Sequence, residues 1–454
     1  MNDDPPTERD STLLDPNNSS INRGSEEGPS RMSYNTKDDL IVVESGSEEP
    51  ESSGVQVPDG GVKAWLTVAG AWFVLFATFG YLYSFGVYQD YYTREYLSNH
   101  TPSSIAWIGS VQLMMPFLVG VVSGKMFDSG KFHLVEILGG LIFVFSVFML
   151  SLAKQHQYYQ IFLSQGIGMG IGLGLTFVPT VSINVHHFRK RRALAAGIGL
   201  SGSSTGATIF PIMINHLLPK IGFASTVRAT GYIVLGFLLI GNALMRTRLP
   251  PRQKKPANLK SFFDLGYSFA VIGALISTLG FYFPVIYLQL FAVQHSVDSN
   301  LAFYSIAILN GASAFGRVLG NHLADVYGSY NIQIPCGLMT GGVILAVLGV
   351  HDRASLVVVS VLYGALSGAW LSLAFAVLST LARSDDEVGA RIGLALALSS
   401  FGSLGSAPIQ GALLTDHFHW TRPIVFSGVA MFVGGACFWV TRMTQVKRLK
   451  TQRV

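Results

Sequence analysis

The chain has 454 residues, of which 50% are hydrophobic and only 13% are charged. Soluble domains carry about 25% charged residues, so this composition excludes an ordinary soluble domain and favours a membrane protein. The formal charge of +5 does not indicate a nucleic-acid partner, because the basic residues fall in the polar breaks between apolar runs. Cys336 and Cys437 lie in different apolar segments, so they predict neither a disulfide nor a metal site.

Residues 1–57 are rich in Ser, Asn, Pro, Asp and Glu and carry no apolar core of the kind that a signal peptide needs. Such a segment cannot bury enough apolar area to offset the loss of chain entropy. We therefore predict a disordered cytosolic N-terminal tail, for which regulation and turnover are the candidate roles.

Apolar runs of membrane-spanning length recur from residue 64 onward. An α-helix needs about 20 apolar residues to cross a bilayer. Runs of this kind lie at 64–89, 104–127, 134–153, 158–185, 193–217, 224–245, 263–291, 301–324, 332–350, 354–381, 390–414 and 422–441. They predict an all-α polytopic membrane protein with twelve transmembrane helices.

The runs divide the chain into two halves of six helices each, residues 58–246 and 263–442. A basic cytosolic linker, 247–262, joins the halves, and a basic cytosolic tail, 443–454, follows the second one. With a cytosolic N-terminus, 24 of the 31 Lys and Arg residues fall on the inner side and six on the outer side. This bias obeys the positive-inside rule and supports the predicted topology.

A short inner loop after the second run carries the motif Gly124-x-x-x-Asp128-Ser-Gly-Lys131, and Asp325 ends a similar stretch after the eighth run. The two aspartates are 325 − 128 = 197 positions apart, which indicates an internal repeat. Duplicated halves are typical of transporters whose substrate site lies between them near the midplane. This motif resembles the inner-loop signature of the major facilitator superfamily, and the resemblance implies that Asp128, Lys131 and Asp325 are gating residues. A carboxylate is also favoured near a helix N-terminus, which is compatible with that role. The alternative is an ordinary polar turn.

Within the major facilitator superfamily, three stretches resemble the monocarboxylate-porter family, especially its fungal branch: 58–61 (PDGG) with Trp65, 187–197 (HFRKRRALAAG) continuing to Gly202 and Gly206, and 84–89 (SFGVYQ) with Tyr91 and Tyr92. The resemblance implies the major facilitator fold and transport by alternating access. It also implies that the gate aspartate caps a neighbouring helix and pairs with a basic residue. Arg191 and Arg192 are candidates for that pairing, or else they only anchor the topology.

Arg317 is the one basic residue deep inside a predicted span. It lies eight residues before Asp325, which puts it roughly 12 Å inside the membrane. A charge at this depth is a functional-site hypothesis by default, and a guanidinium can hold a carboxylate by two parallel hydrogen bonds. The resemblance implies a substrate-binding arginine at this place in the eighth helix. The alternative is a structural arginine bonded to carbonyl groups near the gate.

Four further residues within the spans are candidates for the substrate site: Tyr83, Tyr282, Asn310 and Trp370. They could line a large aromatic cavity. They could equally pack between helices or face lipid, because the sequence does not determine which way each side chain points.

Acidic residues are absent from the middle of every predicted span, and Glu136 comes nearest. Animal monocarboxylate porters carry an aspartate four residues before the eighth-helix arginine, whereas Ser313 occupies that position here. The sequence therefore does not support proton coupling through a buried carboxylate. A proton could travel on the substrate or on a histidine such as His322.

These features predict a secondary active transporter of a small organic solute, namely a monocarboxylate or a related anionic metabolite. Its expected partners are that solute, the lipid bilayer and protons, with no cofactor, no metal and no nucleic acid. The alternatives are an exporter of a fungal secondary metabolite, a vitamin permease, or a non-transporting nutrient sensor on the same fold. No nucleophile, metal cluster or acid–base pair is grouped at one membrane depth, so an enzyme is not expected.

Two expectations concern the surroundings of the protein. The plasma membrane is the default location because no organelle address is visible, and the vacuolar membrane is the alternative. Asn99 begins an N-glycosylation sequon in the first outer loop. Its closeness to the bilayer and to Pro102 disfavours occupancy.

Overall fold

The computed structural model describes residues 60–248, 262–382, 388–415 and 418–453, all of which lie in one compact unit, Val55–Val454. The regular secondary structure of these residues is entirely helical. The predicted N-terminal tail, 1–57, and the linker residues 249–261 lie outside the described residues.

The first half begins with a broken helix. This first span contains α1 (Val62–Ala77), α2 (Phe79–Leu82), α3 (Phe85–Tyr91) and the π-helix η1 (Tyr92–Tyr96). The second and third spans are α4 (Pro102–Asp128) and α5 (Phe132–Ser151), and the fourth contains α6 (Tyr158–Ile161), the π-helix η2 (Phe162–Gly168), α7 (Met169–Ser182) and the 3₁₀ helix η3 (Ile183–His186). The last element of this half is the long helix α8 (Arg192–Leu244).

Gly222 divides α8 into two spans. The helix has 53 residues, which is more than twice the length that a bilayer needs. At Gly222 the backbone turns to φ 75° and ψ 171°, a conformation that only glycine adopts without strain. The described residues contain 11 helical segments that are long and apolar enough to cross a membrane, so this break brings the number of spans to 11 + 1 = 12. The prediction of twelve transmembrane helices is confirmed.

The second half repeats the pattern. Its seventh span is again broken, into α9 (Leu265–Phe281) and α10 (Phe283–Gln294). The other spans are α11 (Ser299–Tyr327), α12 (Ser329–Ala346) with the 3₁₀ helix η5 (Val347–Gly349), α13 (Arg353–Ser379), α14 (Val388–Leu414) and α15 (Thr421–Leu449). α15 continues past the end predicted at 442, so part of the predicted C-terminal tail is helical.

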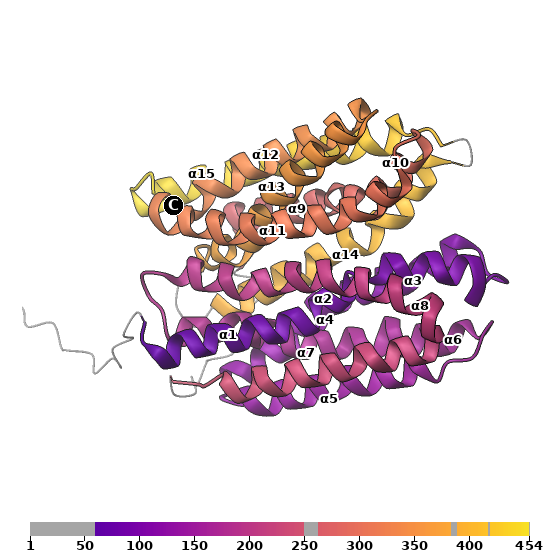
Figure 1. Cartoon of the computed structure of the whole chain (residues 1–454). Helices are drawn as coiled ribbons and strands as arrows, with labels where there is room; N and C mark the ends of the chain where they lie inside the picture. The colour runs from indigo at the N-terminus through magenta and orange to yellow at the C-terminus, as the bar shows by residue number, and fades with distance from the viewer. Residues whose placement is uncertain (1–59, 249–261, 383–387, 416–417, 454) are drawn as a thin grey trace, which may run out of the picture. The chain divides into compact units, whose positions relative to one another are not determined.

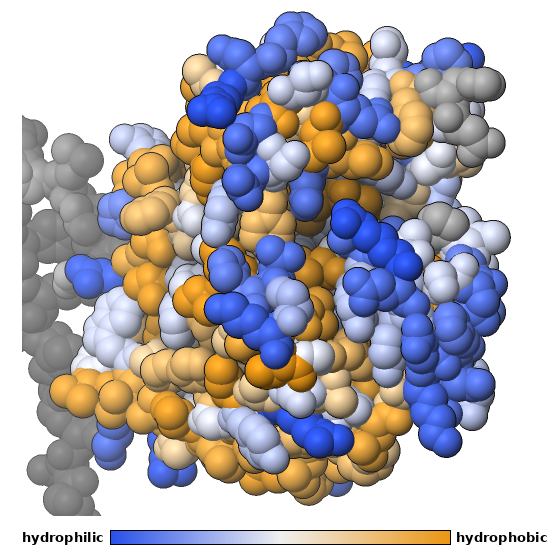
Figure 2. All heavy atoms as spheres, turned by 45° about the vertical axis from the view of Figure 1, so that its right-hand side comes forward, coloured by the Kyte–Doolittle hydropathy of each residue, from blue (hydrophilic) through white to orange (hydrophobic). Residues whose placement is uncertain are grey.

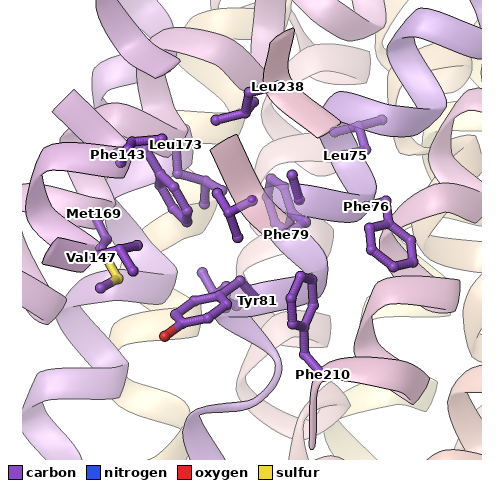
Figure 3. Packing of buried hydrophobic residues seen from close by; sticks show 14 of the residues in the cluster. Leu75, Phe76, Phe79, Tyr81, Phe143, Val147, Met169, Leu173, Phe210 and Leu238 are labelled. Atoms are coloured by element: carbon purple, nitrogen blue, oxygen red, sulfur yellow. The ribbon is translucent and has the colours of Figure 1, made fainter. Parts of the chain in front are cut away.

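Each half has a hydrophobic core of its own, and the two groups of helices are distinct in Figure 1. In the first half the rings of Phe143 and Phe210 pack edge-on against Tyr81, with centroid distances of 6.2 and 5.3 Å (Figure 3). Such edge-to-face pairs are favoured by the charge distribution of aromatic rings. Phe117 of α4 and Phe375 of α13 contact both cores and therefore lie at the seam between the halves.

The flanks of the helices are strongly apolar. Leu141, Phe145 and Phe315 have exposed fractions of 61%, 63% and 80%, although all three lie well inside predicted spans. Figure 2 shows hydrophobic residues over the flank on the left and hydrophilic residues gathered toward the ends of the helices on the right. A water-soluble protein rarely exposes many large apolar side chains next to one another, whereas a lipid bilayer solvates them.

Candidate functional site

Breaks in the first and seventh spans place two tyrosines at corresponding positions. Tyr83 lies between α2 and α3, and Tyr282 lies between α9 and α10. They are 282 − 83 = 199 positions apart, close to the repeat offset inferred from the two aspartates. Irregular backbone at membrane depth is tolerated where protein surrounds it or where it lines a cavity.

Arg317 lies on α11 beside both tyrosines. Its side chain is 5% exposed, and its Nε donates a long hydrogen bond of 3.4 Å to the Ser313 hydroxyl. The Tyr83 hydroxyl and the Tyr282 hydroxyl both interact electrostatically with the guanidinium. The ion pairs found among the described residues involve Arg94, Arg353 and Arg391 and not Arg317. The structure therefore combines a buried cation with hydroxyl groups and no carboxylate partner among these residues.

The same region is where the halves touch. The Ser204 hydroxyl of α8 donates to the Ser313 hydroxyl of α11 across 3.1 Å. A Cβ added at Gly197 of α8 would lie 2.6 Å from the carbonyl oxygen of Arg317, so this glycine is required for the close approach. Arg317 therefore lies at the contact between the two halves, where an alternating-access transporter binds its substrate.

A small cavity is lined mainly by residues of the second half, together with Phe117 of α4. Its volume open to the centre of a water molecule is about 40 Å³, and Tyr282 and Trp370 are among its lining residues. Trp370 is 3% exposed, and its ring packs on Phe281 at 5.2 Å. Asn310 is also buried, but its amide donates to the Ile306 carbonyl of its own helix. Among the described residues, it is not one of those that line this cavity.

The end of the molecule at which α8 begins and α11 ends, which we call the inner end, was predicted to be cytosolic. Here the carboxylate of Asp325 accepts hydrogen bonds from the backbone N–H groups of Ala193 and Leu194, at 3.1 and 2.9 Å. These groups belong to the first turn of α8, where backbone donors have no partner within the helix. A carboxylate at this position is also favoured by the helix dipole. A side chain of the second half thus caps a helix of the first half.

The other predicted gating residues lie at the same end. Asp128 is the last residue of α4 and is half-buried, and Lys131 precedes α5 and is exposed. Arg191 and Arg192 are exposed at the start of α8, where the Arg192 Nε donates to the Phe188 carbonyl. The structure thus shows Asp325 bonded to backbone groups next to these arginines.

Apolar side chains of the two halves also meet near the inner end. Phe177 of α7 and Phe375 of α13 meet edge-on, with centroids 5.3 Å apart. Ala193 joins a small apolar cluster with Ala324 and Leu373, which lie on α11 and α13.

Two side chains that the sequence did not single out become prominent. The sequence does not distinguish Ser204 from the other serines of its Gly/Ser-rich stretch. The packing of α8 on α11 brings its hydroxyl to that of Ser313. Gln333 is buried on α12 and borders the cavity, although it lies near the start of a span where polar residues are common. The spacing of the residues gives no signal for either position.

Glu136 and Asn99 are distant from Arg317 in the sequence, and their hydrogen bonds are to other residues of the first half. Glu136 of α5 is fully buried and accepts a hydrogen bond of 2.7 Å from Thr180 of α7, while its second oxygen has no partner among the described residues. Asn99 is exposed, and its side chain contacts His156 at 3.3 Å.

The sequence matches the family model described as "Major Facilitator Superfamily" over residues 64–351 and 306–453. The chain belongs to the major facilitator superfamily. Its curated relatives in this superfamily include the "Aspyridones efflux protein apdF" of Emericella nidulans, which is 37% identical over 91% of this chain and 84% of its own length. The "Fujikurins efflux protein" of Gibberella fujikuroi is 37% identical over 86% of this chain and 85% of its own.

A solved structure supports the major facilitator fold. The transporter FucP, described in the outward conformation, superimposes with a TM-score of 0.60 at 14% identity, over 86% of this chain and 99% of its own. The protein is therefore a multi-pass membrane transporter of the major facilitator superfamily, and the expectation that it is not an enzyme agrees with these relatives.

Proposed function

We propose that this major facilitator transporter exports an anionic organic metabolite across the plasma membrane by alternating access, with Arg317 binding the anion. The observation that carries the proposal is a guanidinium, 5% exposed, at the contact between the halves, with no ion pair among the described residues. A buried charge without a partner is costly, so proteins keep it for function.

An anionic group is the ligand that this surrounding favours. The guanidinium has five N–H donors, of which Nε is directed at Ser313. The hydroxyls of Tyr83 and Tyr282 lie nearby and can donate to a bound oxygen as well. A carboxylate or another delocalised anion would thus receive two parallel hydrogen bonds from the arginine and a further one from a tyrosine.

Two considerations favour export over import. The curated relatives compared above include proteins named for the efflux of aspyridones and fujikurins. In addition, a membrane potential that is negative inside drives an anion outward, by about 2.3 kcal/mol per charge per 100 mV. The exporter in this proposal therefore needs no coupling ion, and proton coupling is the alternative.

The contacts at the inner end supply the gate. When Asp325 caps α8 and Phe177 meets Phe375, the path from Arg317 to the inner side is closed. Alternating access requires these contacts to break while the two cores, each within one half, stay intact. Asp325 is the gating residue in this proposal, and Asp128, Lys131, Arg191 and Arg192 contribute to the same inner surface.

Within the superfamily we place the chain in the monocarboxylate-porter family. Two of the stretches that resemble that family touch: Trp65 packs edge-on against Phe188, with centroids 5.0 Å apart. The buried His187 ring forms a hydrogen bond of 2.8 Å with the Arg246 carbonyl, so the second stretch also contacts the residues that follow α8. Residues 58 and 59 of the first stretch lie outside the described residues.

The proposal is tested in the source organism by deleting the gene and restoring it as wild type, Arg317→Ala, Arg317→Lys or Arg228→Ala. Arg228 is the matched control, because it bonds Ser151 in the first half and lies away from the seam. Mass spectrometry then compares anionic metabolites in the medium and in the cells.

We expect the deletion strain and the Arg317→Ala strain to retain an anionic metabolite that the wild type and Arg228→Ala release. Arg317→Lys keeps the charge but loses the fork of donors, so export falls by about tenfold or more without disappearing. Wild-type release of every anion by Arg317→Ala would overturn the role of the arginine.

A further inference from the structure

Gln333 is a buried carboxamide whose polar atoms have no protein partner. It lies in the first turns of α12 and is 1% exposed. Neither Nε2 nor Oε1 has a hydrogen-bond partner among the described residues. Most buried polar groups in proteins are hydrogen-bonded, and a buried polar group without a hydrogen-bond partner destabilises the fold. A side chain that leaves both a donor and an acceptor unpaired needs an explanation.

Gln333 is one of the residues that line the cavity described above. The other described lining residues include the aromatic rings of Trp370, Phe117 and Phe438 and the hydroxyls of Ser399 and Ser400. These hydroxyls cannot satisfy the Gln333 carbonyl, because each already donates to its own helix: Ser399 to Ala395 at 2.7 Å and Ser400 to Ala397 at 2.6 Å. Gln333 is therefore part of the wall of a mainly apolar cavity, and its side chain keeps both an unused donor and an unused acceptor.

We propose that Gln333 determines substrate specificity by pairing with an amide group, a carboxamide or lactam, of the transported molecule. A primary carboxamide and a second amide fit each other in a two-point arrangement. The substrate C=O accepts from Nε2, and the substrate N–H donates to Oε1. Neither partner then carries a charge, and both buried atoms of Gln333 are satisfied.

The cavity volume is consistent with a head group and not with a whole metabolite. The space open to a water centre is about 40 Å³, enough for a few heavy atoms. Tyr282 lines this cavity and also interacts electrostatically with Arg317, so one residue connects the cavity with the proposed anion site. The inference thus deepens the proposed function, on which it rests: the anion binds at Arg317 and an amide of the same molecule binds at Gln333.

The test uses the purified full-length protein in detergent, with melting temperature as the readout for three probes. Benzamide supplies the ring and the amide, acetophenone keeps the ring and the carbonyl but lacks the N–H, and 4-carbamoylbenzoate adds a carboxylate to benzamide. The proteins are the wild type, Gln333→Leu, Arg317→Ala and the control Gln112→Leu. Gln112 is also 1% exposed and has an unpaired Oε1 among the described residues, but it is not among the described lining residues.

In the wild type and in Gln112→Leu, we expect the concentration of benzamide that raises the melting temperature to be about tenfold lower than that of acetophenone. One hydrogen bond in a buried site has an effect of this size. In Gln333→Leu this preference is lost. The melting temperature of Gln333→Leu without ligand is unchanged or higher, since an unpaired buried amide has been removed, and this shows that the variant folds.

Equal responses of wild type and Gln333→Leu to benzamide, or no response of the wild type to either amide, would overturn the inference. The Arg317→Ala variant separates it from the proposed function. If Arg317 does not bind anions, 4-carbamoylbenzoate is no better than benzamide in any protein, yet the dependence on Gln333 remains.

Discussion

The carboxylate of Asp325 on α11 accepts a hydrogen bond of 2.9 Å from the backbone N–H of Leu194 on α8. The two residues are separated by 131 positions and belong to different halves of the molecule. Their contact uses a donor that the helix itself leaves unpaired. It can therefore be lost when the halves rock apart without breaking any regular helix.

Replacing Asp325 by Asn should open the inner end more often. The amide keeps the shape but loses the charge that interacts with the helix N-terminus, an effect of about 1 kcal/mol, or roughly fivefold in the open population. A reporter cysteine at Ala376, in the apolar cluster beside Ala193, measures this population by its rate of thiol labelling, after Cys336 and Cys437 have been replaced by Ser.

Asp352→Asn is the matched control for this experiment. Asp352 caps α13 in the same way, accepting from the Ser355 N–H at 2.9 Å, but within one half and at the other end. Hydrogen bonds from Ser355 also hold the pKa of Asp352 below its usual range. We expect Asp352→Asn to lower the melting temperature and leave the labelling rate unchanged. An unchanged rate in Asp325→Asn as well would argue against the gate.

Gly197→Ala should loosen the same seam by crowding. The added Cβ would lie 2.6 Å from the Arg317 carbonyl oxygen, and backbone cannot yield as a flexible side chain does. Overpacking of this kind costs about 1–3 kcal/mol, so labelling at Ala376→Cys should rise by about fivefold or more. Gly199→Ala is the control, because its Cβ meets Ala71 at an ordinary 3.5 Å. Equal rates in the two variants would contradict the close contact.

Tyr83→Phe should weaken binding of the exported anion. It removes the hydroxyl that interacts with Arg317 and leaves the ring in place. The KM measured in proteoliposomes with the anion identified by the deletion experiment should rise about five- to tenfold, as for one lost hydrogen bond to a charged group. Tyr81→Phe removes a hydroxyl that bonds Tyr88 at 2.7 Å in the core, so it should lower stability and not KM. The opposite pattern would separate Tyr83 from the substrate site.

Gly222→Ala should destabilise the protein through its backbone alone. Nothing lies within 4 Å of the added Cβ, but φ 75° and ψ 171° are strained for any other residue, at about 1–3 kcal/mol. Thermal unfolding in detergent should show a lower melting temperature. Gly236→Ala, in the helical part of α8 with equally open space, should leave it unchanged or raise it. A similar loss in both variants would mean that volume and not the backbone angle matters.

Export should follow the membrane potential and not a pH gradient. In proteoliposomes, an imposed potassium diffusion potential drives a monovalent anion with about 2.3 kcal/mol per 100 mV, whereas a pH gradient at zero potential should drive no net flux. Glu136→Gln should leave this behaviour intact, because the amide oxygen can still accept from Thr180. Flux driven by the pH gradient that disappears in Glu136→Gln would establish proton coupling through that carboxyl instead.

The sequence by itself determined the twelve spans, and it predicted the depth of Arg317. Both depend on properties that are additive along the chain, namely the length of each apolar run and the distribution of Lys and Arg. It did not reveal that the fifth and sixth spans would be separated by a sharp break at the single residue Gly222 and not by a loop, because that break depends on backbone angles at one position.

Only the tertiary structure decided which side chains meet. Asp325 reaches Leu194, Ser204 reaches Ser313, and Gln333 lines the cavity because of how helices far apart in sequence are rotated and packed. Among the predicted site residues, it brought Tyr83, Tyr282 and Trp370 to the region of Arg317, whereas the amide of Asn310 bonds its own helix. Within an apolar span the sequence barely distinguishes a face that meets lipid from one that meets protein, since both are apolar.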